Sequence, residues 1–304
     1  RNTMLAVKRN PWIFRRSRLQ EVRRDNAGAR AINTFAVRAV KGAFHILLFL
    51  IFFFPFFWMV STSFKTLGET MTFPPALLPE TFQFSNYRDA LRAIPFATYL
   101  TNSCIVTGSV TALQLLTVVP AAYGFSQYQF RGKGMLFGLT LVTMMIPAQL
   151  VFMPLFILFS KLRMINTYWS LILPFGTSAF GIFMLRQTFN QMPKELVEAA
   201  KLDRAGELKR IFRLFLPMAR PTLVTMALLT FINTWNDYFW PLALTTSDAV
   251  RTLPVGVASL RNIESGTHYN ILMASNVMLT IPIIIAYFLA HKQIIKAFTY
   301  LGDK

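Results

Sequence analysis

The chain has 304 residues, of which 54% are hydrophobic and 14% are charged, and its formal net charge is +18. The charged residues are clustered and leave uncharged runs of about 20 residues, the length of a helix that crosses a bilayer, so the composition excludes an ordinary soluble globular domain. A single cysteine, Cys104, excludes an internal disulfide and a CxxC metal or redox site.

The first 41 residues form a polar, basic segment, which we expect to be a cytoplasmic tail. Within it, Trp12 and Phe14 are followed closely by Arg15, Arg16 and Arg18. This pattern is typical of a segment that lies against anionic lipid headgroups. It is equally consistent with a disordered basic leader.

Six apolar runs follow the tail, and each predicts one membrane-spanning helix. They cover residues 42–60, 99–125, 135–160, 164–185, 221–242 and 269–290. The predicted fold is therefore an all-α integral membrane protein, with six transmembrane helices in a domain over residues 42–290 and a short C-terminal end over residues 291–304.

The distribution of basic residues predicts how these spans are oriented. Twenty-four of the 31 Lys and Arg residues lie in the tail 1–41, near Arg131, in the loop 186–220 and in the end 291–304. The loops on the opposite side hold the other seven. Because Lys and Arg concentrate on the cytoplasmic side of membrane proteins, both termini are predicted to be cytoplasmic. The same distribution accounts for the net charge without a nucleic-acid partner.

The loop between the fourth and fifth spans, residues 187–220, is predicted to contain two short helices. Pro193 suits the first position of a helix, because its missing N–H would be unpaired there. Glu195 and Glu198 favour the positive end of the helix dipole, and the helix is expected to stop near Gly206, where glycine permits a turn. Apolar residues at i, i+3, i+4 and i+7 predict the second helix, and these are Leu208, Ile211, Phe212 and Phe215.

This loop also carries a motif. Glu198-Ala199-Ala200 is followed, after a spacer, by Leu214-Phe215-Leu216-Pro217. The pattern resembles the EAA loop of ABC-importer permeases, in which E-A-A precedes three residues, a glycine, nine residues and an aliphatic-x-Leu-Pro sequence. Arg204 occupies the position of the motif's glycine, and Gly206 is expected to supply the turn instead. Without this resemblance, the segment would be taken for a loop that merely connects two spans.

The resemblance extends over nearly the whole chain and is to the carbohydrate-importer permeases, in the branch of the maltose-permease G subunit. The other segments that carry it are Met145-Ile146-Pro147-Ala148-Gln149, Pro154-Leu155-Phe156, Ile165-Asn166-Thr167, Leu171-Ile172-Leu173, Trp235-Asn236-Asp237 and Pro241-Leu242. The resemblance implies the fold of a type I ABC-importer permease in the inner membrane of a bacterium, and a sugar or oligosaccharide as the transported solute.

The partners that the resemblance implies are a homologous second permease, two cytoplasmic ATP-binding subunits, an extracytoplasmic solute-binding protein and the membrane lipid. The sequence contains no G-x-x-x-x-G-K-[ST] phosphate-binding loop. We therefore expect no cofactor in this chain, with ATP and Mg²⁺ bound by the partner ATPase.

Three groups of residues are candidates for function. The group expected to dock the ATPase comprises Glu195, Glu198, Ala199, Ala200, Leu202, Asp203 and Gly206. Asn233, Asn236 and Asp237 are candidates for the solute pathway, because polar groups in a span usually face a bundle interior or a cavity; helix packing or a solvated helix end would explain them equally well. Contact with the binding protein is expected at residues 262–265 (Asn262, Ile263, Glu264 and Ser265), which could also be a solvated connector.

Other functions fit the sequence less well. A secondary transporter usually carries charged relay residues within its spans, and Asp237 is the only carboxylate in the predicted ones. Three scattered histidines make no metal site, and no nucleophile with a partnered base indicates an enzyme. Within the importer class, a solute other than a sugar, such as a sugar derivative or glycerol phosphate, remains an alternative.

Overall fold

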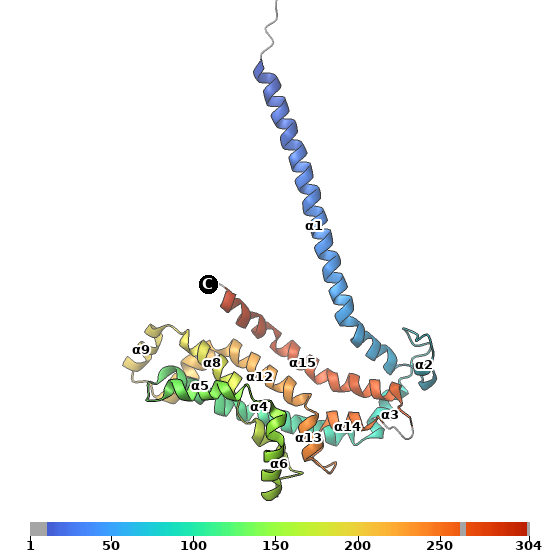
Figure 1. The fold of residues 1–304 in the computed structure, drawn as a ribbon, viewed down its shortest axis with the longest axis vertical. Helices are drawn as coiled ribbons and strands as arrows, with labels where there is room; N and C mark the ends of the chain where they lie inside the picture. Colours follow the sequence, from blue (N-terminus) through green and yellow to red (C-terminus); the bar gives the residue numbers. More distant parts are fainter. Residues whose placement is uncertain (1–10, 262–265, 303–304) are drawn as a thin grey trace, which may run out of the picture. The chain divides into compact units, whose positions relative to one another are not determined.

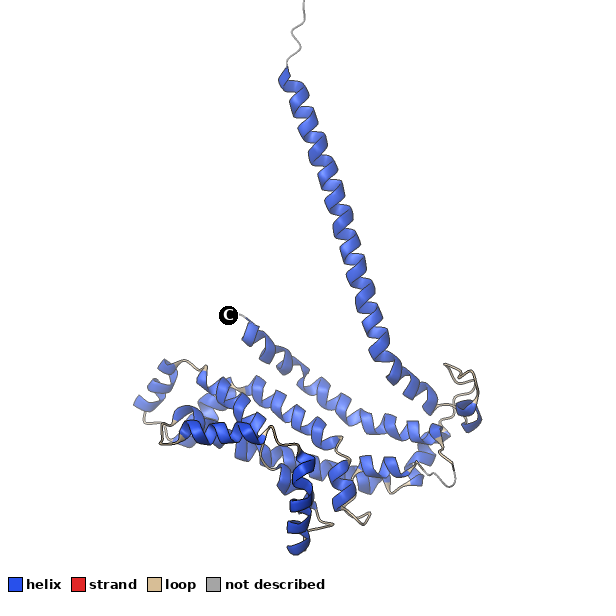
Figure 2. Ribbon diagram, in the orientation of Figure 1, coloured by secondary structure: helices blue, strands red, loops and turns tan. Residues whose placement is uncertain are grey.

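The computed structural model describes residues 11–261 and 266–302 (Figure 1). These residues form helices joined by loops and turns and contain no strand (Figure 2). The first elements are α1 (Pro11–Ser63), α2 (Leu67–Met71), α3 (Ser85–Ala93), α4 (Phe96–Gln127) and α5 (Lys133–Thr143). The middle of the chain forms η1 (Ala148–Val151), α6 (Phe152–Lys161), α7 (Tyr168–Ile172), η2 (Leu173–Phe175), α8 (Ala179–Asn190) and α9 (Lys194–Leu202). The last elements are α10 (Glu207–Arg210), η3 (Ile211–Phe215), α11 (Leu216–Met218), α12 (Arg220–Trp235), α13 (Phe239–Leu244), α14 (Leu253–Ser259) and α15 (Tyr269–Gly302).

The chain divides into two compact units, Arg1–Trp58 and Met59–Lys304. The described part of the first unit is a single helix, α1. This helix continues past Trp58 to Ser63, in the second unit. The boundary predicted at residue 41 falls inside this helix. Aromatic side chains stack along it, with the ring centroids of Phe49 and Phe53 5.1 Å apart.

Three of the six predicted spans are single helices of sufficient length and apolarity to cross a membrane. They are Val37–Ser63 within α1, Phe96–Gln127 and Tyr269–Gln293 within α15. The first two extend past the predicted run at both ends, and the third begins at the predicted residue and extends past the run only at its C-terminal end. The three others are pairs of helices that qualify as spans only when each bent pair is taken together.

The third span was predicted as one helix but is bent by 94° between Lys133–Thr143 and Ala148–Lys161. Pro147 explains the break, because proline lacks a backbone donor and keeps the residue before it out of the helical conformation. The fourth span begins at Tyr168 and not at residue 164, and it bends by 42° before α8. There, Ser178 caps the new helix by accepting a hydrogen bond from the backbone N–H of Gly181 at 3.1 Å.

The fifth span also differs from the prediction of one helix over residues 221–242. Its helix α12 has 16 residues and ends at Trp235, and residues 239–244 form the separate helix α13. At the other end, α12 joins the segment Glu207–Met218 at a bend of 81°. The backbone leaves the helix at residues 236–238, where Asn236 and Asp237 interrupt the apolar run that was predicted as one span.

The second unit is a bundle in which α12 packs against both α4 and α15, and α4 packs against α8 (Figure 1). A polar side chain lies at the centre of this packing. The Gln114 amide of α4 accepts a hydrogen bond from the Thr230 hydroxyl of α12 at 2.7 Å and donates one to the carbonyl of Phe175 at 2.9 Å. This amide therefore satisfies a backbone group that the break between η2 and α8 leaves unpaired.

Candidate functional site

The loop 187–220 contains the predicted helix as α9. The helix begins at Lys194, and Pro193 is the residue before it. Pro193 was predicted to be the first residue of the helix, so the helix begins one residue later than predicted. Glu195 lies in the first turn and Lys201 in the last turn, and both charges favour the helix dipole. Val197 is buried, and it anchors the helix to the bundle below.

The opposite face of α9 is exposed. Glu195, Glu198, Ala199 and Leu202 occupy positions i, i+3, i+4 and i+7 of this face, and all four are exposed. The side chain of Leu202 is 85% exposed. Leu196 is also exposed and was not among the predicted residues, although it lies one turn before Ala199 and Ala200. A carboxylate pair flanked by exposed leucines is a surface suited to a protein partner rather than to water.

The turn after α9 differs from the prediction. Its left-handed residue is Arg204, with φ +50°, whereas Gly206 has φ −62° and ψ 161°. Gly206 therefore does not supply the turn, and it serves instead as the extended residue before α10. The left-handed turn thus lies at the position where the EAA motif has its glycine. Here an arginine adopts the left-handed conformation, which costs a residue other than glycine roughly 1–2 kcal/mol.

Replacement of this arginine by glycine is expected to stabilise the loop. Arg204→Gly should exceed Arg204→Ala in stability by about 1 kcal/mol, because alanine keeps the strained Cβ while both variants lose the charge. The comparison is made by thermal unfolding of the purified protein in detergent. Equal midpoints for the two variants would contradict a strained turn at this position.

The second predicted helix of the loop is not regular. Residues 211–215 form a π-helical turn, η3, between α10 and α11. Ile211 and Phe215 are buried, while Leu208 and Phe212 are exposed, so the four apolar residues do not share one face as predicted. π-Helical turns shift the register of the side chains that follow and are frequent at functional sites.

A hydrophobic cluster connects this loop to the spans. Val197, Ile211 and Phe215 pack together with Phe189 and Leu185 of α8. The rings of Phe189 and Phe215 meet edge to face at a centroid distance of 5.1 Å. Because buried side chains fit closely and their packing transmits displacement, α9 is mechanically continuous with α8 and α12.

The three polar residues predicted in the fifth span lie around the end of α12. Asn233 and Asn236 are exposed, and the Asn236 amide donates to the carbonyl of Ile232 at 3.0 Å. The Asp237 carboxylate, two residues before α13 begins at Phe239, accepts a hydrogen bond from the backbone N–H of Trp240 at 3.3 Å. Asp237 therefore has a structural task, and the two asparagines are the members of this group with accessible amides.

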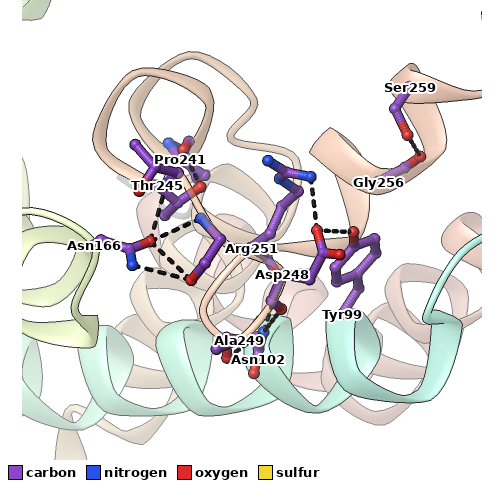
Figure 3. Close-up of polar contacts among 12 residues, drawn as sticks. Tyr99, Asn102, Asn166, Pro241, Thr245, Asp248, Ala249, Arg251, Gly256 and Ser259 are labelled. Atoms are coloured by element: carbon purple, nitrogen blue, oxygen red, sulfur yellow. Dashed lines mark hydrogen bonds and ion pairs between the residues drawn. The ribbon is translucent and has the colours of Figure 1, made fainter.

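The segment that follows α13 is held against α4 by a cluster of polar side chains (Figure 3). The Tyr99 hydroxyl donates to the Asp248 carboxylate at 2.6 Å, and Arg251 forms an ion pair with the same carboxylate at 2.7 Å. The Asn102 amide donates to the carbonyls of Ala249 and Arg251 at 3.0 and 2.8 Å. Because Asn102 is almost fully buried, these bonds fix the backbone of the segment.

Asn166 holds the same segment from a second direction (Figure 3). Its side-chain oxygen accepts hydrogen bonds from the backbone N–H groups of Thr246 and Ser247 at 2.9 and 3.0 Å. Asn166 has φ +62°, a conformation that asparagine tolerates better than most residues. Sequence patterns did not indicate this cluster, since its members are about 80 to 150 residues apart. Residues 262–265, predicted to contact a binding protein, lie outside the described residues.

Comparisons with known proteins agree with these features. Residues 115–300 match the family described as "Binding-protein-dependent transport system inner membrane component". The arabinooligosaccharides transport system permease protein AraQ of Halalkalibacterium halodurans is 34% identical, over 83% of this chain and 91% of that protein. The trehalose/maltose transport system permease protein MalG of Thermococcus litoralis is 34% identical, over 84% of this chain and 92% of that protein.

A solved structure is similar to this chain as well. A chain of a bacterial ABC transporter involved in the import of the acidic polysaccharide alginate superposes with a TM-score of 0.74 and 25% identity, covering 84% of this chain and 95% of that one. The loop with α9 and the bent fifth span both lie within the residue range of the family match. The chain therefore belongs to the binding-protein-dependent transport system inner membrane components, the multi-pass, non-catalytic permease subunits of ABC transporters.

Proposed function

We propose that this permease imports a sugar or oligosaccharide with energy from ATP, as half of a pathway completed by a homologous second permease. Its other partners are two ATP-binding subunits, which bind ATP and Mg²⁺, and an extracytoplasmic solute-binding protein. The exposed face of α9, anchored through Val197, is the observation that carries this proposal. The substrate class is supported by the printed activities of AraQ and MalG.

In this mechanism α9 is held in a groove of one ATP-binding subunit, and Glu195, Glu198, Ala199, Ala200, Leu202 and Asp203 form its docking surface. Gly206 extends this surface after the turn at Arg204. ATP binding closes the two ATP-binding subunits and displaces α9, and the packing of α9 against the bundle carries that movement to the spans. The nucleotide favours the outward-open state only by binding that state more tightly.

The solute pathway is proposed to run along the exposed side of α12 near Asn233 and Asn236. Exposed amides in a span are costly against lipid, so they are best placed facing a polar cavity. The second permease would close this cavity from the other side. Asp237 lies beside it and shapes the end of α12.

If these amides bind the solute, Asn233→Ala and Asn236→Ala should raise the solute concentration needed for half-maximal uptake. Unchanged uptake curves would exclude the two asparagines from solute binding.

The energy source and substrate are tested together in reconstituted vesicles. The chain is assembled with its second permease, ATP-binding subunits and binding protein, and uptake of labelled arabinooligosaccharide, maltose and trehalose is measured. Uptake is expected to require ATP hydrolysis and to persist when a protonophore removes the proton gradient. Uptake driven by the gradient without ATP would instead indicate a secondary transporter.

The orientation is proposed from the distribution of basic residues, with both termini and α9 in the cytoplasm. Single cysteines are introduced at positions 80, 200 and 260 of a variant with Cys104→Ser, and each is labelled from one side of the membrane. Positions 80 and 260 should react from outside, and position 200 from inside. Labelling of position 200 from outside would overturn the docking role of α9.

Residues 262–265 are proposed to contact the binding protein. The preceding segment, residues 244–253, is fixed by Asn102 and Asn166, which supports this assignment because a rigid base can present the loop in a defined position. Glycines at all four positions are expected to leave docking of the ATPase intact and to weaken the stimulation of ATP hydrolysis by loaded binding protein. A titration curve identical to that of the wild type would make the loop a solvated connector.

A further inference from the structure

A side-chain contact links the loop of α9 to the second span. Glu207 is the first residue of α10, five residues after the end of α9. One oxygen of its carboxylate accepts a hydrogen bond from the Tyr123 hydroxyl at 2.6 Å, and the other pairs with the Arg210 guanidinium. Tyr123 lies one turn before the end of α4, 84 residues away in the chain. No sequence pattern indicated a role for either residue.

Tyr123 is held in place by its surroundings. Its side chain is almost fully buried, and its ring meets those of Phe215 and Tyr128 edge to face at centroid distances of 5.0 and 5.9 Å. The same Phe215 also packs against Phe189. The Tyr123 hydroxyl can therefore act as a fixed point, and Glu207 is bonded to it from the loop.

The carboxylate of Glu207 is maintained in its charged form. The hydrogen bond from the Tyr123 hydroxyl, the nearby Tyr128 hydroxyl and the charge of Arg210 hold its pKa below the ordinary glutamate value. A hydrogen bond that involves an ionised group is shorter and stronger than one between neutral groups. The contact between Glu207 and Tyr123 is thus suited to persist while the loop moves.

We propose that Glu207 is a positioning residue for energy coupling: through Tyr123 it ties the docking loop to α4, so that a displacement of α9 moves the second span. This inference rests on the proposed function. The hydrophobic cluster around Val197 already joins α9 to α8, η3 and α4 by apolar contacts, and the bond of Glu207 adds a directional polar link to α4. Both links act on the same rigid loop, and only the polar link can be removed without opening a cavity.

A purely local role for Glu207 would give a different result. The ion pair of Glu207 with Arg210 spans i, i+3 within α10, a helix of only four residues, and the Arg210 side chain is mostly buried. If this pair were the whole function of Glu207, removal of the Tyr123 hydroxyl would have no effect on coupling.

The test compares Tyr123→Phe, Glu207→Gln and the double variant in the complete transporter with its ATP-binding subunits and binding protein. Tyr123→Phe removes the hydroxyl and keeps the ring contact with Phe215. Tyr287→Phe, which removes an exposed hydroxyl from α15, and Lys209→Gln, which removes an exposed charge from α10, are the matched controls. Three quantities are measured: copurified ATP-binding subunit, thermal midpoint, and the ratio of ATP hydrolysis with and without loaded binding protein.

Both single variants are expected to retain the ATP-binding subunits and to lose about fivefold or more of the stimulation ratio, as removal of a coupling interaction should. The double variant should be no worse than Glu207→Gln alone, because the two residues act through one bond. Stimulation within twofold of the wild type in both single variants would overturn the proposal, as would a loss of stimulation matched by loss of assembly or of thermal midpoint. Failure of the proposed function itself is distinguishable, because the wild-type chain would then not retain an ATP-binding subunit at all.

Discussion

Glu198→Lys is expected to abolish transport and the stimulation of ATP hydrolysis by binding protein, while the permease still inserts in the membrane. Glu198 lies in the middle of the exposed face of α9, and its reversal changes the charge of the docking surface by two units. A lysine there would face whatever cation of the ATP-binding subunit pairs with the native carboxylate, and like charges across an interface cost several kcal/mol. Because Glu198 does not pack in the bundle, its replacement should leave the fold of the chain intact.

The measurements are uptake in vesicles, copurification of the ATP-binding subunit and the amount of permease in the membrane. Glu80→Lys provides the control, because it makes the same charge change at an exposed position far from α9 in the sequence. Ala199→Arg should fail in a similar way, since a long side chain would keep α9 out of its groove. Wild-type transport by Glu198→Lys at normal expression would remove α9 from the docking site.

Gly256→Ala is expected to destabilise the protein by about 1–3 kcal/mol, the usual cost of forcing an extra group into a packed core. A Cβ at position 256 would lie 2.1 Å from Cδ2 and 2.4 Å from Cε2 of the Tyr99 ring. The ring is almost fully buried and its hydroxyl is bonded to Asp248, so it cannot move aside without breaking that bond. Figure 3 shows Gly256 on the helix next to Tyr99.

The effect is measured as the thermal midpoint in detergent and as the amount of folded permease in the membrane. Gly134→Ala is the matched control, because a Cβ at position 134 would meet no atom within 4 Å. Combining Gly256→Ala with Tyr99→Leu should recover part of the loss, because the smaller side chain vacates the space. Equal midpoints for Gly256→Ala and Gly134→Ala would contradict the close approach of α14 to α4.

The sequence by itself determined the class of protein, the positions of the apolar segments and the presence of the helix α9. Whether a segment can cross a bilayer depends on the apolar character of about 20 consecutive residues, and it does not depend on residues that are distant in the chain. The E-A-A sequence and the charges of Glu195 and Lys201 likewise act within one helix. For this reason α9 was predicted to within about one residue at its start, and the single-helix spans differ from the predicted runs only at their ends.

Only the tertiary structure decided the bends, the turn after α9 and the polar links between spans. Apolar residues continue on both sides of Pro147, so hydropathy could not show the bend there. Asn236 and Asp237 do interrupt the apolar run between α12 and α13, but hydropathy does not show that the backbone leaves the helix at these residues. The left-handed conformation of Arg204 contradicts its own local preference and is imposed by the elements on either side. Tyr123 and Glu207 meet across 84 residues because the bundle brings the end of α4 beside the loop, and no local pattern records such a contact.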